Sequence, residues 1–233
     1  MAREQRSDGA PPEPMRAVDR ALRLLVSVAE ADDGISLADA ARRTSLAPST
    51  ALRQLRGLEA AGFVSRTPEG RFTAGPTLTR LGLRAAGRSP LAALAEPHLR
   101  ALALELEESA YLAVRSDAAN GVYLAQAPSP LAIRHVSWLG ELVPLDGSAL
   151  GAALEGRVDA DGVAVRTDAV EEGVTAVAAP VRGTGGAVVG AISLLGPAFR
   201  LRGRALAAAR AQVARHAAEL GAEYGGAAAR SVA

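Results

Sequence analysis

The segment 36–73 restricts the fold of this chain more than any other, because it places two helix starts close together. Ser36 can cap the free backbone N–H groups of one helix, with Asp39 as the acid of a capping box. That helix should be short and end near Thr44. Pro48 suits the first position of the next helix, where its missing N–H costs nothing. A short helix, a tight turn and a second helix are therefore expected.

The flanking residues extend this pattern on both sides. Apolar residues at helical spacing predict a preceding helix over residues 16–31. A Thr-Pro-Glu-Gly turn at 67–70 separates two short runs around Phe63 and Arg71, and proline followed by glycine suits such a turn. The runs predict a β-hairpin. Three helices followed by a hairpin make a winged helix-turn-helix.

Positive charge is concentrated in this part of the chain. Between Arg42 and Arg88 there are nine arginines and two acids, whereas residues 1–41 hold five arginines and eight acids and residues 89–233 hold twelve arginines and fifteen acids. The formal net charge of the whole chain is only +1. A basic block in a mildly acidic chain is typical of polyanion binding. The alternatives are a solvated basic face without a partner and a helical protein-interaction module of the same shape.

The helix that starts at Pro48 divides into two faces when its residues are placed at 100° steps. Ala51 and Leu55 face the neighbouring helices, while Arg53 and Arg56 point outward. Such a helix fits the major groove of B-DNA, and wing arginines can contact the backbone or the minor groove. The residues expected to contact double-stranded DNA are Arg43, Pro48, Ser49, Thr50, Arg53, Gln54, Arg56, Arg66 and Arg71.

The rest of the chain predicts further helices and then a sheet. Residues 76–87 predict a linking helix, and Ser89 starts another that Pro97 should kink or split. His98 is expected at the surface or at a cap, without a catalytic role. Strands are predicted at 110–116, 122–128, 131–138, 163–168, 175–182 and 187–196, with a small-residue helix between the third and the fourth. An amphipathic helix ends the chain, and the whole arrangement indicates an α+β domain.

Several kinds of site lack the residues that they need. The chain has no cysteine, which excludes disulfides, thiolate metal sites and cysteine nucleophiles. Its three histidines are far apart in sequence, and no acid, base and nucleophile are grouped. We therefore expect no metal, no cofactor and no catalytic residue. Ser148 lacks the frame of a hydrolase nucleophile and is interpreted as a packing or cap residue.

Neither a membrane span nor a signal peptide is indicated. No apolar run approaches the roughly 18–20 residues of a spanning helix, and the first residues lack an apolar stretch. A cytoplasmic protein is expected.

At this point the ordered motifs resemble the IclR family of bacterial transcriptional regulators. The N-terminal motifs are AVDRALRLLVSV and SLADAARRTSLAPSTALRQLRGLEAAGFV, and the C-terminal motifs are VPLDGSALGAAL, EEGVTAVAAPV and GAISLLGPAFRL. Each motif alone is weak, but the ordered set is specific and spans nearly the whole chain. The resemblance implies a winged-helix DNA-binding domain, a linker helix and a GAF-like effector-binding domain. It also implies a dimer or a dimer of dimers that binds a palindromic promoter site and responds to a small organic metabolite.

The resemblance also implies particular site residues. The DNA-contacting positions of the family fall on Ser49, Thr50 and Arg53, while Pro48 stands where a basic residue is common and removes one phosphate contact. Leu195 stands where a polar residue can occur, which suggests a more apolar or smaller ligand. The effector pocket is expected to be lined by Trp138, Val143, Ala149, Leu150, Pro180, Ser193 and Leu195.

One stretch departs from the family pattern. Between Leu154 and Val163 the chain has only EGRVDADG, where family members usually carry an additional helical stretch that covers one side of the pocket. The ligand site could therefore be shallower, use a neighbouring subunit as a lid, or be absent.

The expected organisation has five parts. They are a disordered tail at 1–14, a winged helix-turn-helix domain at 15–75, a linker helix at 76–89, a shortened GAF-like antiparallel-sheet domain for effector binding and oligomerisation at 90–224, and a flexible tail at 225–233. The expected function is a sequence-specific DNA-binding regulator, a repressor or dual regulator and not an enzyme. The alternative is a ligand-independent regulator or a protein-interaction module with a degenerate pocket.

Overall fold

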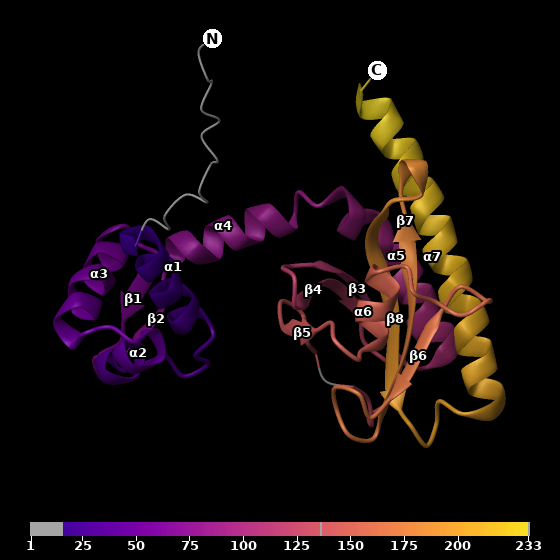
Figure 1. Cartoon of the computed structure of the whole chain (residues 1–233), viewed down its shortest axis with the longest axis horizontal. Coiled ribbons are helices and arrows are strands. Elements are labelled where there is room, and N and C mark those ends of the chain that lie inside the picture. The colour runs from indigo at the N-terminus through magenta and orange to yellow at the C-terminus, as the bar shows by residue number, and fades with distance from the viewer. Residues whose placement is uncertain (1–15, 136, 233) are drawn as a thin grey trace, which may run out of the picture. The chain divides into compact units, whose positions relative to one another are not determined.

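The structure is a computed structural model that describes residues 16–135 and 137–232. The chain folds into two compact units that divide between Ala85 and Ala86, and each unit is described by itself (Figure 1). The disordered tail predicted at 1–14 lies outside the described residues. Within the described residues, no helix combines the length and the apolar character needed to cross a bilayer.

The first unit is a three-helix bundle with a two-stranded hairpin, as predicted (Figure 1). Ser36 caps the second helix, because its Oγ accepts a hydrogen bond from the Asp39 N–H at 3.1 Å. The Asp39 carboxylate accepts a hydrogen bond from the Ser36 hydroxyl at 2.7 Å, so the acid meets the side chain of its cap. The elements are α1 (Arg16–Ala29), α2 (Leu37–Thr44), α3 (Pro48–Ala60), β1 (Val64–Arg66) and β2 (Phe72–Ala74).

A small core joins the bundle to the hairpin. Ile35 and Phe72 exchange two backbone hydrogen bonds of 2.8 Å, which attaches the connection between α1 and α2 to β2. Gly34 adopts a φ of +71°, and a Cβ there would lie 2.7 Å from Thr73 Cγ2, so only glycine fits this approach. The buried core residues are Leu24, Val28, Ile35, Ala40, Ala41, Ala51, Leu55, Val64 and Phe72.

Helix α4 (Pro76–Ala86) follows β2 at the place predicted for the linker helix. None of its residues is buried. Leu81 and Leu83 are 42% and 70% exposed, so α4 presents apolar side chains to solvent in this chain.

The second unit is an α+β domain on one antiparallel sheet, which confirms the predicted fold class. The strand order is β5-β4-β3-β8-β7-β6. A short turn of 3₁₀ helix, Thr184–Gly186, connects β7 to β8. The strands are β3 (Ser109–Arg115), β4 (Asn120–Ala127), β5 (Leu142–Pro144), β6 (Ala164–Thr167), β7 (Val174–Arg182) and β8 (Val188–Pro197).

The strand predicted at 131–138 is wrong, because the described residues of this segment form a loop. The hydroxyl of Ser129 donates to the Glu107 carbonyl at 2.5 Å and accepts from the Leu131 N–H at 3.1 Å. Prolines on either side of Ser129 remove further backbone donors. Strand β5 lies beside β4 instead.

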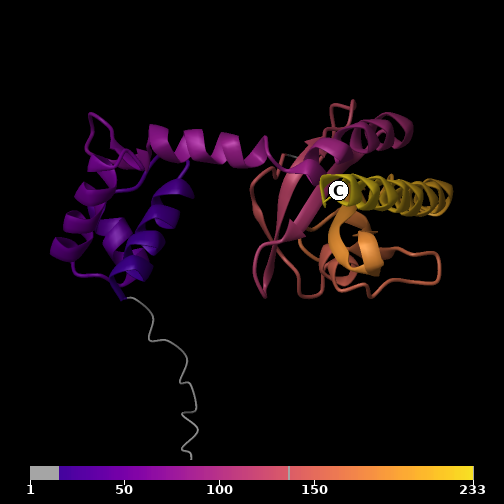
Figure 2. The same ribbon diagram turned by 90° about the horizontal axis from the view of Figure 1, so that it is seen from above.

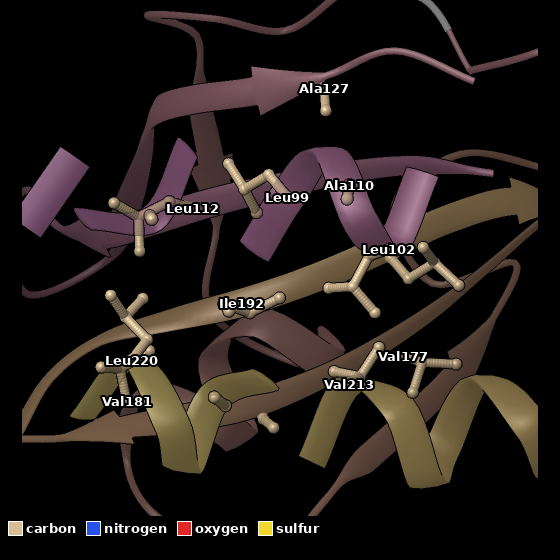
Figure 3. Close-up of a cluster of buried hydrophobic side chains, with 14 of the residues drawn as sticks. Leu99, Leu102, Ala110, Leu112, Ala127, Val177, Val181, Ile192, Val213 and Leu220 are labelled. Atoms are coloured by element: carbon tan, nitrogen blue, oxygen red, sulfur yellow. The ribbon is translucent and has the colours of Figure 1, made fainter. Parts of the chain in front are cut away.

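Helices cover the two faces of the sheet unequally. Helices α5 (Pro90–Leu106) and α7 (Gly203–Val232) pack side by side on one face, and α6 (Ala149–Leu154) packs on the other (Figures 1 and 2). In the larger core, Leu99 and Leu102 of α5 meet Ile192 of the sheet and Val213 and Leu220 of α7 (Figure 3). This core fixes the sheet from one side and leaves the α6 side for a pocket.

Two helix predictions differ from the structure. Of the predicted kink or split at Pro97, the split does not occur: α5 continues through this residue, which lies on the exposed side of the helix. Helix α7 continues to Val232, so the predicted flexible tail at 225–233 is helical up to that residue. The alanines in this segment have the highest helix propensity and offset the cost of the paired glycines.

Candidate DNA-binding face and effector pocket

The outward face of α3 carries unpaired basic side chains. Arg53, Arg56 and Ser49 are exposed, while Ala51 and Leu55 are buried in the bundle, which confirms the two predicted faces of this helix. Within the described residues, neither arginine has a hydrogen-bond or ion-pair partner. Both guanidinium groups are therefore available to a ligand of α3.

The other predicted residues of α2 and α3 surround this face. Arg43 near the end of α2 and Pro48 at the start of α3 are exposed. Thr50 and Gln54 are half-buried. The Oε1 atom of Gln54 is buried without a hydrogen-bond partner among the described residues, so Gln54 directs this atom toward the domain.

The two wing arginines are engaged within their own domain. Arg71 donates hydrogen bonds to the carbonyls of Asp33 at 2.9 Å and Gly34 at 2.6 Å. Arg66 lies with its guanidinium carbon 5.5 Å from the centre of the Phe72 ring and donates a long hydrogen bond of 3.4 Å to a carbonyl in the turn. Arg71 therefore ties the hairpin to the connection between α1 and α2.

The second unit contains a small pocket between α6, the sheet and two loops. Six of the seven residues predicted for the effector site line it. Pro180 does not, because it lies in a separate groove beside Ala214 of α7. The free space between the lining side chains is small. The lining residues are Tyr123, His135, Trp138, Val143, Ser148, Ala149, Leu150, Arg166, Ala169, Val170, Glu171, Val174, Ala176, Ser193 and Leu195.

A buried imidazole forms the polar side of the pocket. His135 Nδ1 lies 2.7 Å from the hydroxyl of Tyr111, and His135 Nε2 lies 3.3 Å from the Glu171 carboxylate. Burial raises the pKa of Tyr111 to about 12, and the nearby Glu171 charge acts in the same direction. Tyr111 therefore stays a neutral phenol at neutral pH, and Glu171 supplies a negative charge at the pocket mouth.

Ser193 and Tyr123 form a second polar pair in the wall. The Ser193 hydroxyl is buried and makes no hydrogen bond of normal geometry within the described residues. It lies near enough to Tyr123 to lower the pKa of that phenol, although burial dominates and the Tyr123 pKa is raised. A polar ligand atom can reach the Ser193 hydroxyl without displacing a strong protein hydrogen bond.

The short connection after α6 contains no helix, which agrees with the departure noted in the sequence. Asp159 and Asp161 in this connection accept hydrogen bonds from Arg210 of α7 at 2.9 and 2.6 Å. The pocket is covered instead by the loop between β6 and β7, which supplies Ala169, Val170 and Glu171. The loss of the extra stretch therefore leaves the pocket with a cover from this chain.

Several residues that line the pocket were not predicted. Some of them lie in a strand pattern that the sequence shows, and others lie in loops without such a pattern. Ala176 pairs with Leu195 across β7 and β8, so strand alternation could have found it. His135 and Glu171 come from loops, and no periodic pattern marks them.

Outside both sites, the structure corrects the expectation for His98. The side chain is buried rather than at the surface, and its Nδ1 lies 2.9 Å from Nδ1 of His216.

The comparisons with known proteins agree along most of the chain. The profile of the IclR helix-turn-helix domain matches residues 17–68, and the profile of the bacterial transcriptional regulator IclR C-terminal domain matches residues 83–156 and 153–221. The HTH-type transcriptional regulator Rv1719 of Mycobacterium tuberculosis is 30% identical over 225 residues, which covers 82% of this chain and 85% of the relative.

Solved structures share the fold at lower identity. An IclR transcriptional regulator from Alicyclobacillus acidocaldarius matches with a TM-score of 0.77 and 24% identity, over 90% of this chain and 99% of its own. An IclR homologue from Microbacterium hydrocarbonoxydans, complexed with 4-hydroxybenzoate, matches with a TM-score of 0.71 and 19% identity, over 89% of this chain and 98% of its own. The chain therefore belongs to the IclR family of bacterial transcriptional regulators, which are not enzymes, and it binds DNA through its helix-turn-helix domain.

Proposed function

We propose that the protein binds a palindromic operator as a homodimer or a dimer of dimers. In each DNA-bound dimer, the α3 helix of each copy would occupy one half-site. The observation that carries this proposal is the outward face of α3, where Ser49, Arg53 and Arg56 are exposed. Arginine can pair bidentately with guanine in the major groove, and serine can reach a phosphate or a base. Occupancy of an operator in a promoter excludes polymerase, so repression is the proposed sign, and the cytoplasm is the proposed compartment.

An apolar stripe on α1 supports the dimer. Val18, Leu22 and Val26 recur every fourth residue and are 46%, 55% and 51% exposed. Residues at this spacing share one face of a helix. A second copy that covers this stripe would bury apolar surface, and binding to a palindrome requires that the two α3 helices of the dimer lie about 34 Å apart, one turn of DNA.

We further propose that the pocket of the second unit binds a small organic effector. The convergence of a few polar groups, among them His135, Glu171 and Ser193, on a mostly apolar wall supports this, because such a mixture is typical of ligand sites. The relative complexed with 4-hydroxybenzoate supports a small organic molecule as the ligand class. Leu195 supports a ligand with an apolar part at that wall.

The small volume of the pocket fixes how such a ligand would act. The free space among the lining residues is small, so the proposal includes a wider arrangement of the covering loops that an effector selects or opens. An effector shifts the equilibrium between two arrangements only by its differential affinity for them. The ligand would therefore change operator affinity through the loops that hold His135 and Glu171.

A ligand-independent regulator is the second candidate, and the same small volume favours it. To separate the two, operator DNA is first identified by footprinting the purified protein on genomic DNA. Mobility shifts are then measured with a metabolite panel for the wild type, Glu171→Gln and the control Glu172→Gln, which changes an adjacent exposed acid outside the pocket lining.

The proposal predicts one metabolite that changes operator affinity in the wild type and in Glu172→Gln. Glu171→Gln should shift the effective metabolite concentration by about tenfold, since a charged partner of His135 is lost. Operator binding that no metabolite alters would support the ligand-independent candidate, and the absence of any specific operator would refute the proposed function.

A further inference from the structure

Two histidines meet between the helices that lie side by side on the sheet (Figure 2). His98 comes from α5 and His216 from α7, and their Nδ1 atoms are 2.9 Å apart. Their side chains are 9% and 6% exposed. Neither residue belongs to the DNA-binding face or to the effector pocket, so this pair has no role in the functions described above.

Glu219 of α7 supplies a carboxylate to the same point. Its Oε2 lies 3.9 Å from His98 Nδ1 and 3.8 Å from His216 Nδ1, which is too far for a hydrogen bond to either ring. Ligand atoms around a tetrahedral zinc ion lie about 3.3 Å apart, given metal–ligand bonds of about 2.0–2.1 Å. The distances between the three atoms, 2.9, 3.8 and 3.9 Å, lie on both sides of this value. Small side-chain rotations would therefore place an ion between them.

We propose that His98, His216 and Glu219 form a binding site for a divalent transition-metal ion of the zinc type. Two imidazole nitrogens and one carboxylate oxygen are a ligand set that zinc uses in proteins, with a fourth position left for water. Imidazole ligands favour zinc, cobalt, nickel and copper ions, whereas magnesium and calcium prefer oxygen ligands alone.

Neighbouring side chains orient the ligands. Arg215 donates to both oxygens of Glu219, to Oε1 at 2.9 Å and more weakly to Oε2 at 3.1 Å, which holds the carboxylate beside the two rings. Glu223 Oε1 lies 3.4 Å from His98 Nε2. A carboxylate behind a ligating histidine fixes the tautomer that leaves the other nitrogen free for the metal.

Metal binding would also break the hydrogen bond between Arg215 and the His216 ring. Arg215 donates to His216 Nε2 at 2.8 Å, which leaves the His216 proton on Nδ1, where it can be shared with His98. With a metal at Nδ1, this proton moves to Nε2 and Arg215 must release the ring. Its side chain is 47% exposed and already donates to Gln212 at 2.7 Å, so it can make this change. The ion then replaces one hydrogen bond between α5 and α7 with coordinate bonds.

The test uses the full chain without a histidine tag and titrates it with Zn²⁺ by calorimetry and with Co²⁺ by visible absorption. The variants are Glu219→Gln, which changes an exposed ligand, and Glu96→Gln, a matched change of an exposed acid on α5 two residues before His98. A third variant, His98→Asn, removes a buried ligand. Circular dichroism and thermal unfolding without metal establish that each variant folds.

We expect one ion per chain, a tetrahedral Co²⁺ spectrum and a higher unfolding temperature with Zn²⁺ in the wild type and in Glu96→Gln. Glu219→Gln should weaken Zn²⁺ binding by about tenfold or more, and His98→Asn should abolish the Co²⁺ spectrum. Equal binding by Glu219→Gln and Glu96→Gln would overturn the site, as would the absence of saturable binding at about 1 mM Zn²⁺. Glu219 lies on an exposed helix face, so Glu219→Gln is expected to fold. The test therefore does not depend on His98→Asn, which changes a buried side chain.

Discussion

An ion pair with a buried carboxylate connects the sheet to the loop that carries His135. Arg200 donates two hydrogen bonds to the Glu108 carboxylate at 2.6 and 2.7 Å and a third to the Ile133 carbonyl at 2.9 Å. The Glu108 side chain is 3% exposed. A Cβ at Gly196 would lie 2.4 Å from this carboxylate, so the glycine makes room for the pair. One arginine therefore holds both a strand end and a pocket loop.

Glu108→Gln should lower the free energy of unfolding by about 2 kcal/mol, typical of a hydrogen bond to a charged group. The change weakens the hydrogen bonds of a buried carboxylate, while the Arg200 side chain, 25% exposed, keeps its access to solvent. Urea unfolding followed by circular dichroism measures the loss, with Glu107→Gln as the control, because Glu107 is an exposed neighbour. A loss for Glu108→Gln no larger than that of the control would show that the pair adds little.

The buried phenol of Tyr111 predicts how stability depends on alkaline pH. Its pKa in the folded protein is raised to about 12 from 10.0, so the folded state binds the phenolic proton more tightly than the unfolded state does. The stabilisation is fully present below pH 10 and is lost as the pH rises toward 12. Urea midpoints measured from pH 9 to pH 11.5 should fall less in Tyr111→Phe than in the wild type, and equal slopes would contradict the shift.

At the scale of elements, the wing and the recognition helix should respond differently to the loss of an arginine. Arg71 bonds to two backbone carbonyls, so Arg71→Ala should destabilise the first unit by about 1 kcal/mol and leave the salt dependence of DNA binding unchanged. Arg56 is free within the described chain, so Arg56→Ala should leave stability unchanged and lower the salt slope by about 1. Thermal unfolding and DNA titrations at several salt concentrations measure both, and a reduced salt slope for Arg71→Ala would show that this side chain leaves the carbonyls to bind phosphate.

The elements that the sequence predicted well are those with strong local signals. The Ser36 cap, Pro48 and the 67–70 turn each act within a few residues, and the structure contains all three. The 131–138 segment has strand-like alternation, but the hydrogen bonds of Ser129 to distant residues hold it as a loop. Such long-range contacts cannot be seen in the local pattern.

The pocket shows the same limit. Ser193 and Leu195 face the pocket because they alternate on β8, and both were expected there. His135 and Glu171 reach it from two loops, and the His98–His216 pair joins residues 118 positions apart. The sequence contains these side chains, but only the fold brings them together.

At the scale of the whole molecule, the α1 stripe predicts self-association. Leu22→Asp should shift the protein from dimer to monomer and lower operator affinity, because it places a charge in the proposed apolar interface. Arg20→Asp is the matched control, since it adds the same acid at an exposed position outside the stripe. Sedimentation of both variants tests the interface, and a dimeric Leu22→Asp would place it elsewhere.

Helix α3 is proposed as the element that selects the DNA sequence, and one measurement tests this most directly. The ratio of operator affinity to nonspecific DNA affinity is determined at fixed salt for the wild type, Arg53→Ala and the control Arg100→Ala, an exposed arginine in the second unit. We predict that Arg53→Ala lowers the ratio by about tenfold to a hundredfold, as expected for the loss of a bidentate base contact, and that Arg100→Ala leaves it unchanged. An unchanged ratio in Arg53→Ala would contradict the assignment of α3 as the recognition helix.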